Sequence, residues 1–146
     1  MYYKKRLVLI NPRKDKVMEK WRSVWRIGLA PQISRTALHA LASALRQDDR
    51  RLMQGAFCAG RGDIVGACAI GYCGWQGEGC SSAPEVESYY HRVCEAADAA
   101  FDEPAACRFF LQWFDAVPRP TMRRELLAEV TLALRQSARS LACACQ

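Results

Sequence analysis

The segment that divides the chain reads GAFCAGRGDIVGACAIGYCGWQGEGC over residues 55–80. It holds eight of the nine glycines and four of the eight cysteines of the chain, and no amphipathic helix pattern accounts for this composition. Glycine permits positive φ and close approach of backbones, so such a concentration marks tight turns, close packing or a loop around a ligand. We expect residues 55–80 to form an irregular, close-packed connector between two helical halves.

Apolar residues at helical spacing flank this connector on both sides. They predict a mainly α fold, a compact bundle of about five to six helices. The alternative is an α+β fold, with a short hairpin in residues 55–75 and an N-terminal strand in residues 2–10. The helices are expected over residues 15–29 and 34–46, from Asp48 or Asp49 to Phe57, and onward from Ser82, Asp102 and Thr121.

The length of 146 residues suits a single domain, which buries enough surface to form a core without disulfides. Residues 1–14 form a basic arm or an extension of this domain, and we expect residues 142–146 to be a frayed tail. No apolar run approaches the roughly 20 residues that a membrane helix needs, and the N-terminal apolar run is too short for a signal peptide. We therefore expect a cytoplasmic protein of bacterial type with no membrane partner.

Charge is divided unevenly along the chain. Residues 1–54 carry thirteen Lys or Arg and four Asp or Glu, residues 55–104 carry two and eight, and residues 105–146 carry six and three. This division indicates either a surface for a polyanion or ion pairing between segments of the chain. The sequence alone does not separate the two explanations.

Nucleic-acid binding is the alternative function that the basic first third supports. Clustered Lys and Arg side chains neutralise phosphates, and the helices expected at 15–29 and 34–46 have a helix-turn-helix-like outline. The residues that would contact the nucleic acid are Lys4, Lys5, Arg6, Arg13, Lys14, Lys16, Lys20, Arg22 and Arg26.

The eight cysteines raise the question of a metal site, but their spacing argues against one. Cys58, Cys68, Cys73 and Cys80 lack the C-x-x-C pair that usually nucleates a four-thiolate site. They are weak candidate ligands, and we expect neither a metal nor another cofactor.

A thiol enzyme or redox sensor centred on Cys73 and Cys80 is a second alternative. Cys80 precedes the helix expected from Ser82, and the dipole at a helix N-terminus lowers the pKa of a thiol. The nearest candidate base, His91, would lie roughly 13 Å along that helix from its cap, which is too far to reach Cys80.

No pattern of residues identifies a reaction. The glycine-rich segment lacks the spacing of a P-loop or of a dinucleotide-binding loop, and the pairs Glu85/Glu87, Asp98/Asp102 and Glu125/Glu129 occupy helical positions where solvated charge is expected. Whether the protein is an enzyme stays open, and the sequence favours a binding role. The function we expect is that of a small binding or adaptor protein whose partner is another protein or a second copy of itself.

Overall fold

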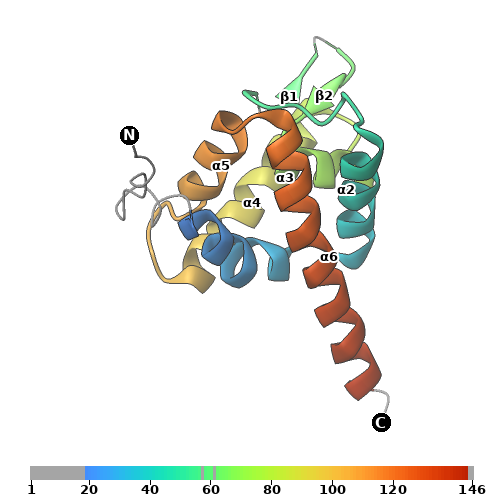
Figure 1. Cartoon of the computed structure of the whole chain (residues 1–146). Helices are drawn as coiled ribbons and strands as arrows, with labels where there is room; N and C mark the ends of the chain where they lie inside the picture. The colour runs from blue at the N-terminus through green and yellow to red at the C-terminus, as the bar shows by residue number, and fades with distance from the viewer. Residues whose placement is uncertain (1–18, 57, 61, 145–146) are drawn as a thin grey trace, which may run out of the picture.

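Helices dominate the part of the chain that the structure describes, which is residues 19–56, 58–60 and 62–144 of a computed structural model. Figure 1 shows a helical bundle with one small hairpin, so the prediction of a mainly α fold is confirmed. The N-terminal strand of the alternative fold lies outside the described residues. The elements are η1 (Val24–Leu29), η2 (Ala30–Gln32), α2 (Arg35–Gln47), β1 (Cys58–Ala59), β2 (Gly66–Ala67), α3 (Ala69–Tyr72), η3 (Cys73–Gly77), α4 (Ala83–Phe101), α5 (Cys107–Ala116) and α6 (Arg119–Ala144).

The described part of the first helical segment is α-helix at residues 19–23 and widens into the π-helix η1. Gly28 lies inside η1, where it packs on α4. A Cβ at this position would lie 2.9 Å from the carbonyl oxygen of Ala97. Glycine therefore lets η1 and α4 approach closely.

The helix α2 has the boundaries that its sequence indicates. Ser34 caps its N-terminus, since the hydroxyl accepts a hydrogen bond from the Ala37 amide at 3.1 Å. Asp48 ends it with a left-handed φ of 53°. The expected core positions Ala37, Leu38, Leu41, Ala42 and Leu45 are all buried.

The short helix expected from Asp48 or Asp49 to Phe57 is not present in the described residues of this segment. The chain instead runs beside β2, and the Met53 amide donates to the Ala67 carbonyl at 2.8 Å. Arg119 of α6 fixes this course by donating to the carbonyls of Asp49 and Leu52 at 2.9 and 2.8 Å. Long-range hydrogen bonds of this kind override a weak local helix preference.

The connector at residues 55–80 is more regular than expected. β1 and β2 form the short antiparallel hairpin of the alternative fold, with Ala59 opposite Gly66, and it lies at one end of the bundle (Figure 1). α3 and η3 follow it and pack against α2 and α4. Gly77 meets Ala37 of α2 so closely that a Cβ would lie 2.5 Å from the Ala37 Cα.

The last three helices begin at positions that differ in part from the expected ones. Ser82 caps α4 as expected, accepting from the Glu85 amide at 3.3 Å. Asp102 ends α4 with a φ of 61° and does not begin α5. Because α6 begins at Arg119, Thr121 is not its N-cap.

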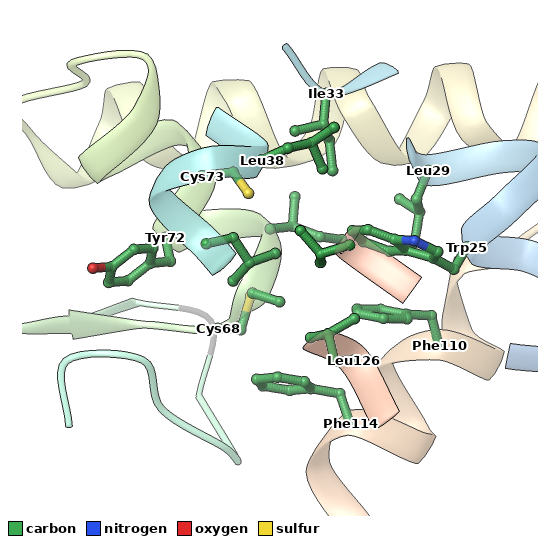
Figure 2. Packing of buried hydrophobic residues seen from close by; sticks show 14 of the residues in the cluster. Trp25, Leu29, Ile33, Leu38, Cys68, Tyr72, Cys73, Phe110, Phe114 and Leu126 are labelled. Carbon is green, nitrogen blue, oxygen red and sulfur yellow. The ribbon is translucent and has the colours of Figure 1, made fainter. Parts of the chain in front are cut away.

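One apolar core joins these elements. Figure 2 shows Trp25, Phe110 and Leu126 converging from η1, α5 and α6. The rings of Trp25 and Phe110 stack with centroids 5.4 Å apart. The aromatic residues of α5 therefore hold the first and last helical segments together.

Candidate functional site

One charged cluster joins the first helical segment to α6 around a buried carboxylate. Glu129 of α6 is only 3% exposed, which corrects the expectation of a solvated carboxylate. Its oxygens accept from Arg22 Nη1 at 2.9 Å and from Arg26 Nε and Nη2 at 2.7 and 2.8 Å. Glu125 binds Arg22 as well. Burial alone would raise the pKa of Glu129, but Arg26 and Arg22 outweigh it and hold this pKa below its ordinary value.

This cluster bears on the basic residues considered for nucleic-acid binding. Arg22 and Arg26 neutralise Glu129, and Lys20 pairs with Glu103 at 2.9 Å. Ion pairing between segments therefore accounts for these three cations. The other six, Lys4, Lys5, Arg6, Arg13, Lys14 and Lys16, lie outside the described residues, and their role stays a prediction.

A second basic cluster forms where α6 crosses the end of α2, and sequence reasoning missed it. Arg46, Arg123 and Arg124 line a groove of about 350 Å³ together with three apolar residues. Arg123 also donates to the Leu45 and Arg46 carbonyls at 2.9 and 3.1 Å, which caps the end of α2. Because 77 residues separate Arg46 from Arg123, only the packing of α2 on α6 reveals this groove.

The four weak candidate metal ligands lie on different elements. Cys58 belongs to β1, Cys68 caps α3, Cys73 begins η3, and Cys80 precedes α4. Within the residues that the structure describes, no group of three or more His, Cys, Asp or Glu could hold a metal ion.

The two candidate reactive thiols have surroundings that favour the protonated form. Cys73 is fully buried beneath α2, and burial raises its pKa (Figure 2). Cys80 lines a depression of about 520 Å³ together with Glu78, Gly79 and several residues of α4, among them Glu85. Partial burial and the charges of Glu85 and Glu78 raise the pKa of Cys80. The expected effect of the helix dipole is therefore outweighed, and this corrects the argument for a thiolate at Cys80.

A different pair of cysteines lies side by side. The Cys107 Sγ of α5 donates to the backbone carbonyl of Cys94 on α4 at 3.5 Å, and each thiol shifts the pKa of the other. Tyr90 and Asp98, one turn before and after Cys94, contact Cys94 and Cys107 respectively. Their i, i+4 spacing on α4 is the only signal of this cluster in the sequence.

The helix α6 projects beyond the rest of the bundle (Figure 1). Leu134 is its last buried residue among the side chains that the structure describes, and its carbonyl accepts from Arg35 of α2 at 3.2 Å. At this point α6, η1, η2 and α2 surround a notch of about 300 Å³. The residues lining the notch are mostly apolar or small, namely Arg26, Ala30, Pro31, Ile33, Leu38, Ala133, Gln136 and Ser137.

Comparison with protein-family models, curated proteins and solved structures found no match to this chain. Among the described residues, no helix combines the length and the apolar character needed to cross a membrane. The function is therefore argued from the surfaces and clusters of the molecule itself.

Proposed function

We propose that this chain is a small cytoplasmic binding protein that self-associates through the projecting end of α6 and the notch at its base. The observation that carries the proposal is the length of α6. The helix runs ten residues past Leu134, to Ala144, which is about 15 Å at 1.5 Å per residue. A helix end of this length is marginal in water without tertiary contacts, so a partner that covers it would stabilise it.

The face of α6 that enters the core continues into the projecting end. Ala138 lies one turn beyond Leu134 on the same face and is exposed. Arg135 and Arg139 are also exposed, but they lie about 100° and 140° around the helix from Leu134 and stay clear of this face. The described part of this face therefore offers the small side chain of Ala138 to a partner, while Arg135 and Arg139 remain in solvent.

A second copy of the chain is the partner that this geometry favours. The projecting end and the notch adjoin each other, so a two-fold axis can place the end of each α6 in the notch of the other copy. Small residues at the contact, such as Ala133, Ser137 and Ala138, let two helices approach closely. Each copy would then bury the same two surfaces.

Sedimentation velocity between about 1 and 100 μM tests the proposal. We expect the mass of two chains at the upper concentrations and a shift to one chain in Ala138→Glu, which places a charge on the contact face. Ala128→Glu is the matched control, because Ala128 is also exposed on α6 but lies about 120° around the helix from Leu134. A wild-type chain that sediments as one chain throughout, or equal dissociation by both variants, refutes self-association through α6.

A further inference from the structure

We propose that Cys94 and Cys107 form a redox-active dithiol that peroxide converts into an intramolecular disulfide between α4 and α5. This site is independent of the proposed self-association. It also differs from the thiol site expected at Cys73 and Cys80, since those residues lie on η3 and on the segment before α4.

Proximity of the two cysteines is the first requirement, and the packing of α4 on α5 supplies it. Cys107 Sγ lies 3.5 Å from the Cys94 carbonyl oxygen, and each thiol shifts the pKa of the other. The start of α5 is held in place by Asp98, whose carboxylate accepts from the Cys107 amide at 2.9 Å. Cys94 and Cys107 are both free thiols, so both members of the pair are available for reaction.

The two thiols have different surroundings, which assigns a different role to each. Cys94 is partly exposed, and the neighbouring Cys107 and Tyr90 side chains lower its pKa although burial and the charge of Asp98 oppose this. Cys107 is 4% exposed, and its hydrogen bond to Cys94, its burial and Asp98 raise its pKa. Cys94 is thus the more exposed of the two residues and the thiol that ionises first, and Cys107 is the buried thiol beside it.

The reaction proceeds in two balanced steps. The Cys94 thiolate attacks one oxygen of hydrogen peroxide, the O–O bond breaks, and the products are a sulfenic acid and hydroxide. The Cys107 sulfur then attacks the Cys94 sulfur, the S–O bond breaks, and water leaves with the proton of Cys107. The sum consumes two thiols and one peroxide and yields one disulfide and two waters, and a dithiol reductant reverses it.

Peptide mapping tests the proposal directly, because Arg92 and Arg108 flank the pair. Trypsin therefore releases residues 93–108 as one peptide that contains both cysteines and no others. The reduced full-length chain is treated with increasing hydrogen peroxide, remaining thiols are blocked with N-ethylmaleimide, and the digest is analysed by mass spectrometry. We expect this peptide to lose two hydrogens and to escape labelling at about tenfold less peroxide than two other peptides require, residues 52–61 with Cys58 and residues 62–92 with Cys68, Cys73 and Cys80.

Two controls separate the folded arrangement from the mere presence of two nearby cysteines. In 8 M urea the preference for the 93–108 disulfide should disappear, and Cys80→Ser should leave the disulfide yield of the folded chain unchanged. In Cys107→Ser, the sulfenic acid at Cys94 should persist and react with dimedone. Labelling of both Cys94 and Cys107 by N-ethylmaleimide after the other thiols have been oxidised, or an equal preference in urea, overturns the proposal.

Discussion

Replacement of the buried carboxylate of Glu129 by an amide should be among the most destabilising single-atom changes in this chain. The Glu129→Gln variant keeps the shape of the side chain but leaves Arg22 and Arg26 without their shared counter-ion. Removing one partner of a buried ion pair costs about 3–5 kcal/mol. Because the Arg26 side chain is 52% exposed and regains water, and because Arg22 keeps its pair with Glu125, we expect about 3 kcal/mol at pH 7.

Thermal and urea unfolding followed by circular dichroism measure this cost. At about 3 °C per kcal/mol, the melting temperature should fall by roughly 10 °C. Glu95→Gln is the control, because Glu95 is exposed on α4 and the same substitution there should change stability by less than about 0.5 kcal/mol. Equal stability of the two variants would contradict an energetic role for the Glu129 cluster.

The pH dependence of the stability difference between wild type and Glu129→Gln provides an independent check. Arg26 and Arg22 hold the pKa of Glu129 below its ordinary value against the effect of burial. The stabilisation is therefore complete above the unfolded pKa of about 4.3 and is lost as the pH falls through the lower, folded value. The gap between wild type and Glu129→Gln should stay constant from about pH 8 to 5 and close at more acidic pH. A gap that does not change with pH would refute the assignment of the effect to ionised Glu129.

Two further substitutions test the packing around the hairpin and α2. Gly77→Ala should destabilise the fold by about 2 kcal/mol or more in the same unfolding assay, since the new methyl would lie 2.5 Å from Ala37 atoms. Gly62→Ala is the control, because a methyl there meets nothing within 4 Å and should be nearly neutral. Arg119→Ala removes a 2.7 Å ion pair with Asp48 and two hydrogen bonds to backbone carbonyls. We expect the free energy of unfolding to fall by about 2 kcal/mol and amide hydrogen exchange in residues 49–53 to become faster. Unchanged exchange there would show that Arg119 does not hold this segment.

The helical elements with strong periodicity were predictable because local patterns specify them. The Ser34 cap, the leucines of α2 and the core positions of α6 depend on residues three or four apart. The segment after α2 was not predictable in this way, since its course depends on Arg119, which lies about 70 residues further along the chain. The predicted start of α5 was wrong for a related reason. The side chain that caps this helix is Asp98 on the preceding helix and not a residue at its own N-terminus.

The internal charge cluster shows what a division of charge along a sequence can and cannot indicate. Arg22 and Arg26 form an i, i+4 pair of cations, and Glu125 and Glu129 form an i, i+4 pair of anions on another helix. Glu129 also interrupts the apolar face of α6 beside Val130, which a solvated carboxylate has no reason to do. Two pairs of opposite charge with the same i, i+4 spacing, one of them on a helix face that enters the core, therefore predict ion pairing between the helices. They do not predict a surface for a polyanion. This reasoning removes Arg22 and Arg26 from the basic surface, because both neutralise Glu129.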